Sequence, residues 1–485
     1  MKQIIKLSDL LKIDEYTYEI PQSYRHDMRV PARVFMNKHM INDVLSDRAL
    51  WQLVNVATLP GIQSYAFGMP DIHQGYGFPI GGVAATAIDE GGVISPGGIG
   101  YDINCGVRLL TAQVTMRELE PHKERLASEL FHAIPSGVGK GGNLAFKPKE
   151  LDSILTYGAH RMLELEYGTQ EDILFCEEGG RMDIADYRLI SLHAKQRGAD
   201  QLGTLGSGNH FLEVQVIDEI FDEKTADVFG LYKGNITIMI HCGSRGLGHQ
   251  TCTDYVRRMM QGLTKWDYEL PDRELICAPF TSPEATDYFS AMAAASNYAW
   301  ANRHMIGHWV RQAWQKVMGM SVPLKLVYDV SHNIGKIETH TVNGIQKKLL
   351  LHRKGATRAF GPGHPALPSH YQPVGQPVLI PGTMGTASYV SVGTDASMNS
   401  AFGSSCHGAG RKLSRAQAKK TIAPRQLRDQ LAHKGIIVRS DSDMGLVEEA
   451  PKAYKDIEDV IDVVHGAGLA RKVARLKPLA VIKGG

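Results

Sequence analysis

The chain has 485 residues, of which 43% are hydrophobic and 21% charged, so its composition excludes a disordered chain and fits a globular protein with a large core. Six cysteines exclude a disulfide scaffold at this length, and no apolar stretch reaches the roughly 20 residues of a membrane span. The net charge of +2 gives no indication of a nucleic-acid partner. Charged residues interrupt segment 1–16, which argues against a signal peptide, so we expect a cytoplasmic protein with free thiols.

Hydrophobic periodicity predicts a mixture of helices and strands. In chain order we expect a strand at 107–114, helices at 116–132 and 151–167, strands at 211–216 and 236–240, a long helix at 283–318, a strand at 324–330, and helices at 424–433, 452–464 and 469–476. Ser282 should cap the long helix, with Pro283 in its first turn and Gly319 at its end. Helices and strands do not alternate regularly and no repeat or linker divides the chain, so we predict a single complex α+β domain over residues 1–485.

Four histidines share one setting, in which a short apolar strand meets a glycine-containing turn: His210, His241, His332 and His407. Strand ends are rigid, and glycine lets backbones approach closely, so such positions can assemble side chains from distant parts of a sequence. For any one of the 20 histidines, a hydrogen-bonded core or surface position is the simpler interpretation. The shared setting of four favours a common site.

Asp102 and Cys105 lie three residues apart in a segment with glycine on both sides. A carboxylate, a thiolate and several imidazoles together suit one or two divalent cations, and a thiolate has enough lone pairs to bridge two of them. The ligand types alone leave zinc and manganese both open.

Two basic runs lie in the last quarter of the chain, at 411–434 and 471–483. Such runs can follow a phosphate backbone, and they are equally well explained as solvated helix faces.

Seven segments, in this order, resemble the RtcB family of tRNA-splicing RNA ligases and span nearly the whole chain: 68–77, 97–108, 205–213, 241–248, 328–333, 381–389 and 407–411. The resemblance implies two manganese ions, one held by Asp102, Cys105 and His210, and the other by Cys105, His241 and His332. It implies that His407 is the catalytic residue and carries a covalent guanylate.

The resemblance also implies a GTP site formed by Asn209, His210, Phe211, Leu212, Glu213, His332, Asn333, Pro381, Gly382, Thr383, Met384, Ser388, His407, Gly408, Ala409, Gly410 and Lys483. Thr383 stands where we expect serine more often, and the hydroxyl is kept. Arg245 and Arg411 would face RNA or phosphate. Glu213 could orient the ring of His407 or bind an edge of guanine.

The implied reaction joins an RNA 2′,3′-cyclic phosphate or 3′-phosphate end to a 5′-hydroxyl end, in tRNA splicing or RNA repair. His407 would take guanylate from GTP and pass it to the RNA 3′-phosphate, and the 5′-hydroxyl would then displace GMP. The resemblance further suggests a monomeric enzyme that works with an archease-type activator, without a membrane.

Two other interpretations use parts of the same pattern. A metal-dependent RNA phosphodiesterase or phosphatase would need the Asp, Cys and His ligands but neither GTP nor a nucleophilic His407. A non-catalytic RNA-binding or chaperone-like protein would depend on the basic runs and would tolerate loss of Cys105.

Overall fold

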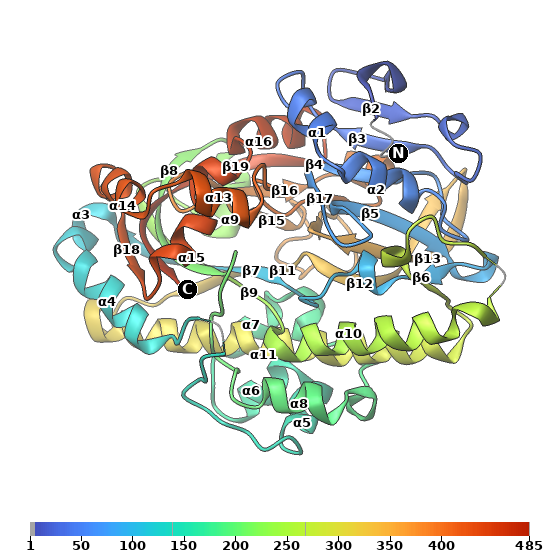
Figure 1. The fold of residues 1–485 in the computed structure, drawn as a ribbon. Helices are drawn as coiled ribbons and strands as arrows, with labels where there is room; N and C mark the ends of the chain where they lie inside the picture. Colours follow the sequence, from blue (N-terminus) through green and yellow to red (C-terminus); the bar gives the residue numbers. More distant parts are fainter. Residues whose placement is uncertain (1–4, 138, 267, 485) are drawn as a thin grey trace.

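The computed structural model describes residues 5–137, 139–266 and 268–484, and it shows an α+β fold in which helices surround two large sheets (Figure 1). The α+β class predicted from the sequence is confirmed. Nearly all strand pairs in the two large sheets are antiparallel; β3 with β4 and β18 with β19 are the parallel ones. No helix in the described part of the chain is long and apolar enough to cross a membrane.

The first large sheet contains seven strands in the order β1 (Leu11–Lys12), β2 (Thr17–Ile20), β3 (Ala32–Phe35), β4 (Ala66–His73), β5 (Ile80–Ala87), β13 (Ile345–Lys354) and β12 (Asn333–Val342). The register between β4 and β5 shifts between Gly68 and His73. Because extra residues in one strand leave the regular ladder, the segment containing Asp71 is free to turn its side chain toward another part of the molecule.

The second large sheet contains β11 (Lys325–Ser331), β7 (Gly106–Thr115), β9 (Asn235–Cys242), β8 (Phe211–Ile220), β19 (Ala470–Lys483), β16 (Ser388–Gly393) and β15 (Pro377–Ile380), with β18 (Ile437–Ser440) beside β19. Two small sheets pair β6 (Val93–Ile94) with β10 (Ala278–Pro279) and β14 (Ala356–Arg358) with β17 (Ser404–Cys406). The predicted strands at 107–114, 211–216, 236–240 and 324–330 all lie within the second large sheet.

The helices are α1 (Ile41–Ser46), α2 (Ala49–Val56), α3 (Met116–Leu119), α4 (Lys123–Ala133), α5 (Leu151–Tyr157), α6 (Ala159–Glu164), α7 (Gln170–Leu174), α8 (Leu192–Gly198), α9 (Glu223–Phe229), α10 (Arg245–Gly262), α11 (Pro283–Met318), α12 (Asp395–Ala401), α13 (Arg415–Thr421), α14 (Pro424–His433), α15 (Asp443–Glu448) and α16 (Ile457–Gly466). Figure 1 shows α10 and α11 side by side along one edge of the molecule, with α5, α6 and α8 next to them. The hydroxyl of Ser282 accepts a hydrogen bond from the amide of Ala285, and Gly319 ends α11 with a φ of +91°, so the predicted bounds of this helix are confirmed.

Three sequence predictions about helices need correction. Segment 469–476, predicted as a helix, is the first half of β19, where antiparallel pairing with β16 and β8 overrides the helix preference of its Lys, Arg and Ala residues. The predicted helix 116–132 is interrupted at Glu120–His122, around Pro121, and helix 151–167 breaks at Gly158, whose φ is +56°. Helix α10 was not predicted, because its first turn contains Gly246 and Gly248.

Candidate active site

The predicted metal-ligating residues meet at one edge of the second large sheet. Gly106 pairs with Cys242 of β9 and with Ser331 of β11. The neighbouring residues Cys105, His241 and His332 therefore lie together at the ends of these strands. Phe211 pairs with His241, which places His210 there as well. The four neighbouring strands thereby bring together Cys105, His210, His241 and His332 from positions up to 227 residues apart, as the rigid strand ends of the sequence suggested.

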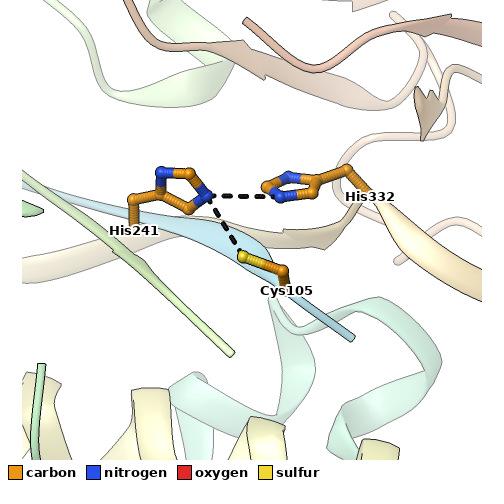
Figure 2. Close-up of side chains that lie close together, drawn as sticks. All are labelled: Cys105, His241 and His332. Carbon is orange, nitrogen blue, oxygen red and sulfur yellow. Dashed lines mark hydrogen bonds between the residues drawn. The ribbon is translucent and has the colours of Figure 1, made fainter. Parts of the chain in front are cut away.

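The donor atoms of these side chains converge on two points that share Cys105. The thiol Sγ of Cys105 lies 3.2 Å from Nε2 of His241, which lies 3.2 Å from Nε2 of His332 (Figure 2). On its other side, Sγ lies 3.4 Å from Nε2 of His210, which lies 2.8 Å from a carboxylate oxygen of Asp102. Ligands of one ion at bond lengths of 2.0–2.3 Å lie roughly 3.3–3.8 Å apart, so the donor atoms of both groups lie slightly closer together than ligands around a bound cation. The donor atoms of each group all lie within 4.8 Å of one another.

Burial and neighbouring charges shift the pKa of every ligand in the cluster; for His210, burial is outweighed by the nearby Cys242, Cys105 and Asp102, which raise the pKa well above its usual value. Burial raises the pKa of the Cys105 thiol to about 12, and the nearby Asp102 carboxylate adds to the rise. Burial also holds the pKa of His241 and of His332 well below the usual range, so both imidazoles are neutral and offer lone pairs. Burial opposes ionisation of Asp102, but its pairing with His210 outweighs burial and lowers its pKa to about 2. A divalent ion at the shared position would stabilise the thiolate of Cys105.

Two adjacent residues of α11 fix the backbone that carries the ligands. Arg303 donates from Nη1 to the carbonyl of Asn104, at 2.6 Å, and to that of Cys242, at 2.9 Å, and its charge is balanced by Asp329. Asn302 donates to the sulfur of Cys242 at 3.2 Å. All of these side chains are buried, and Asn104 has a φ of +52°, a conformation that needs such support in a residue other than glycine. The ligand positions are thus held before any ion binds.

His407 lies directly after β17 and next to the metal-ligand cluster. Its ring centroid lies 4.8 Å from that of His332. Its Nδ1 atom lies 2.5 Å from a carboxylate oxygen of Asp71, without the alignment of a straight hydrogen bond, and its amide donates to the same oxygen at 3.2 Å. Gly410 permits this approach, because a Cβ atom there would lie 2.2 Å from the carbonyl of Asp71. The contact with Asp71 leaves Nε2 as the ring nitrogen that can act as a nucleophile.

A single cavity joins His407 to most of the predicted GTP-site residues. It is lined by Asn209, Phe211, Glu213, His332, Asn333, Pro381, Gly382, Thr383, Met384, His407, Gly408, Ala409, Gly410 and Lys483. Three predicted GTP-site residues, His210, Leu212 and Ser388, do not line it. Leu212 points into the hydrophobic core, on the other face of β8 from Phe211 and Glu213, so it could contact a ligand only through its backbone. The hydroxyl of Ser388 accepts a hydrogen bond from the amide of Gly382 at 3.1 Å and so shapes the loop that lines the cavity.

Two ionisable residues of the cavity, Glu213 and Lys483, have shifted pKa values. Burial raises the pKa of Glu213 to about 8, although a hydrogen bond from Gln215 and the charge of Lys483 act in the opposite direction. Burial lowers the pKa of Lys483, whose amine donates to the carbonyl of His210 at 3.1 Å. The carboxylate in contact with His407 is that of Asp71, whereas Glu213 accepts a hydrogen bond from Gln215 at 2.9 Å and lines the cavity.

The two arginines expected to face RNA are both held by protein groups. Arg411 lines the cavity, but its guanidinium pairs with Glu449 at 3.0 Å and donates to the carbonyl of Glu448 at 2.7 Å. Arg245 does not line the cavity, and it donates to the hydroxyl of Thr204 at 3.1 Å. Their role toward RNA stays a prediction.

Sequence reasoning gave no role to Asp71 or to two buried lysines near it. The amine of Lys455 donates to the carbonyls of Pro70 and Ile72, on either side of Asp71, and its amide donates to the carbonyl of Gly410. Lys354 lines the cavity and donates to the carbonyls of Tyr76 and Phe78 at 2.8 Å. Burial lowers the pKa of Lys455 to about 8 and of Lys354 to about 7. The only signal for Asp71 was its place in segment 68–77, between glycines and beside His73.

Comparisons with known proteins agree with this geometry. A family model described as "tRNA-splicing ligase RtcB" matches residues 52–484. A protein from Archaeoglobus fulgidus named "tRNA-splicing ligase RtcB" is 53% identical over 478 residues, which cover 98% of this chain and 99% of that protein. One from Thermococcus kodakarensis with the same name is 51% identical over 487 residues and 100% of both chains. An "RNA-splicing ligase RtcB" from Mycobacterium tuberculosis is 51% identical over 435 residues, covering 89% of this chain and all of that protein. The chain therefore belongs to the RtcB family of tRNA-splicing ligases.

Proposed function

We propose that this protein is an RNA ligase that uses GTP and two manganese ions to join RNA 2′,3′-cyclic phosphate or 3′-phosphate ends to 5′-hydroxyl ends. The names of its relatives support the ligase activity. The observation that carries the finer proposal is the position of His407: one ring nitrogen contacts Asp71, while the ring lies beside His332 in the cavity. This arrangement suits a nucleophile next to a metal-bound phosphate.

In the first step, Nε2 of His407 attacks the α-phosphorus of GTP. A bond forms between nitrogen and phosphorus, the bond to the bridging oxygen breaks, and pyrophosphate leaves with the electron pair. Asp71 keeps the proton on Nδ1 and stabilises the positive charge that develops on the imidazole. Gly408, which lines the cavity, leaves room for the nucleotide against the backbone.

The residues of the cluster fit two divalent cations. Asp102, Cys105 and His210 would hold one, and Cys105, His241 and His332 the other. When bound, such ions offset negative charge on phosphate oxygens and on the leaving group. The choice of manganese rests on the family resemblance.

In the later steps, water first opens a cyclic phosphate: its oxygen bonds to phosphorus, the bond to the 2′-oxygen breaks, and that oxygen takes a proton from the water, which leaves a 3′-phosphate and a 2′-hydroxyl. An oxygen of the RNA 3′-phosphate then attacks the guanylate phosphorus, the bond to Nε2 breaks, and His407 returns to its neutral form. The 5′-hydroxyl oxygen next attacks the activated 3′-phosphorus, forming the phosphodiester and releasing GMP. The names of the relatives suggest cleaved tRNA as the substrate class. We further propose that the enzyme is a monomer and works with an archease-type activator.

The decisive experiment uses GTP labelled with ³²P at the α-phosphate. The protein is incubated with this GTP and manganese, with and without an activator, and denatured. We expect a labelled adduct that is labile to acid and stable to alkali, as a phosphoramidate is. If neither GTP nor ATP forms an adduct with any of several divalent metals, the guanylate mechanism is excluded. A metal-dependent phosphodiesterase then becomes the better interpretation.

Changing Asp71 to asparagine is expected to slow adduct formation by about 100- to 10,000-fold with little change in GTP binding. An amide NH₂ group facing Nδ1 favours the tautomer with the proton on Nε2, which has no lone pair for attack. The rate is measured by quench-flow with labelled GTP, and Asp71→Glu, which keeps the carboxylate, serves as the matched control. A normal rate in Asp71→Asn would show that Asp71 has no part in orienting His407.

GTP binding is expected to release a proton from Glu213 at pH 7. The raised pKa of about 8 keeps this carboxyl neutral in the free protein, and N–H groups of guanine would stabilise its charged form. GTP affinity should therefore rise with pH between about 6 and 8. Calorimetry without metal, in buffers of different ionisation enthalpy, measures the number of protons released when GTP binds. Subtracting the number for Glu213→Gln from that for wild type removes the protons that come from the triphosphate. Equal proton release in both proteins would contradict this role.

A further inference from the structure

Three aromatic rings form a continuous row beside the active site. The ring of Tyr76 packs edge-on against Tyr101, with centroids 5.4 Å apart, and Tyr101 lies 5.0 Å from the ring of His249. The rings come from the loop after β4, from the segment before β7, and from α10. Tyr76 is 37% exposed and His249 is exposed, while Tyr101 between them is half-buried.

The row begins inside the cavity and ends at the surface. Tyr76 and Tyr101 line the same cavity as His407 and His332. Tyr101 directly precedes Asp102, a predicted metal ligand. His249 lies near the start of α10, four residues after Arg245. A strand that lies along this row would therefore enter the cavity that contains His332 and His407.

The backbone under the rings is held firmly, although the ring faces are exposed. The carbonyl of Tyr76 accepts a hydrogen bond from the buried amine of Lys354 at 2.8 Å, and the amide of Gly77 donates to Glu274 at 3.0 Å. Gly77 and Gly100, with φ values of +64° and +99°, allow the turns that bring the two tyrosines together. Core packing alone does not account for this arrangement, because the two outer rings are the exposed ones. Fixed, exposed rings are what a stacking surface requires.

We propose that Tyr76, Tyr101 and His249 form a stacking site for a nucleobase of the RNA strand that enters the cavity. The inference rests on the proposed RNA-ligase function. Single-stranded RNA is held largely by stacking of bases on aromatic side chains, and every base has a face for this contact. Such a site tolerates different sequences, as a ligase that joins cleaved ends needs.

The test measures stacking directly, without ligation. Short RNAs carry 2-aminopurine, a fluorescent base that stacking quenches, next to a 3′-phosphate in one set and next to a 5′-hydroxyl in the other. Fluorescence and affinity are recorded without GTP for wild type, Tyr76→Ala, His249→Ala, Tyr76→Trp and Tyr232→Ala. Tyr232 is a matched control, because it is 42% exposed and does not line the cavity.

We expect wild type to quench one of the two probes, and the two alanine variants in the row to lose quenching and bind RNA about 5- to 100-fold more weakly. Tyr76→Trp should keep the quenching, and Tyr232→Ala should behave as wild type. The strand whose probe responds is the one that the row receives. If neither probe is quenched by wild type, or if Tyr76→Ala quenches normally, the stacking site is excluded. The two proposals fail in different assays. If the ligase proposal is wrong, the GTP adduct is absent whether or not the 2-aminopurine probe is quenched.

Discussion

Replacing His407 by alanine is expected to abolish the covalent nucleotide adduct and to lower RNA joining by a factor on the order of 1000 or more. The methyl group cannot attack phosphorus, and no other described side chain of the cavity lies between Asp71 and His332 as this ring does. GTP binding should change little, because the proposed contact with guanine is made by Glu213 and not by His407. Labelled GTP reveals the adduct, and a gel assay with 3′-phosphate and 5′-hydroxyl RNAs measures joining.

His433→Ala serves as the matched control for this variant. His433 is exposed on α14 and its ring contacts only the carbonyl of Asp429, so its loss should leave adduct and joining unchanged. An adduct of normal yield in His407→Ala would place the guanylate on another residue. Normal joining without any adduct would favour a route with no covalent nucleotide.

Changing Cys105 to alanine is expected to remove both metal ions together. The sulfur of Cys105 is the one donor atom that belongs to both ligand groups. Loss of a direct ligand should weaken binding at each position by at least the roughly 10- to 100-fold that loss of an outer hydrogen-bond partner costs. Manganese content after equilibrium dialysis, measured by mass spectrometry, should fall from two ions per chain to near zero.

Two further variants separate bridging from general damage to the fold. His332→Ala should lose one ion and keep the other, because His332 belongs to only one ligand group. Cys252→Ala removes a thiol that is equally buried but lies outside the cluster, and it should keep both ions. If Cys105→Ala retains one ion at normal affinity, the sulfur does not bridge, and each site has its own separate ligands.

Much of the fold could be predicted where local signals agree with the final structure. Ser282, Pro283 and Gly319 mark the ends of α11 by local hydrogen bonding and backbone conformation, which need no knowledge of the rest of the chain. Segment 469–476 contains equally good helix formers, yet it is a strand because β8 and β16 supply partners on both sides. Strand partners that lie 77 or more residues away leave no mark on the local sequence.

The candidate site also contains residues that could be predicted from the sequence and residues that could not. The histidines at strand ends could be identified because glycines follow or precede them, and the strand period of two would already have separated Leu212 from Phe211 and Glu213. The role of Asp71 could not be derived, because it depends on an irregular register between β4 and β5 and on a loop 336 residues later in the chain. The hydrogen bonds from Asn302 and Arg303 to the backbone and side chains near the ligands could not be predicted either. Both residues lie in α11, among many buried residues that pack in the core.

The separation of Asp71 from His407 also bears on how the protein is made. Synthesis on the ribosome runs from the N-terminus, so the segments that hold the metal-ligand cluster, up to His332, emerge well before the nucleophile. A nascent chain that has not yet reached β17 has the complete set of proposed metal ligands but not the proposed nucleophile. On the proposed mechanism, the chemistry begins only when the last fifth of the chain has folded against the first sheet, so an unfinished chain would not consume nucleotide.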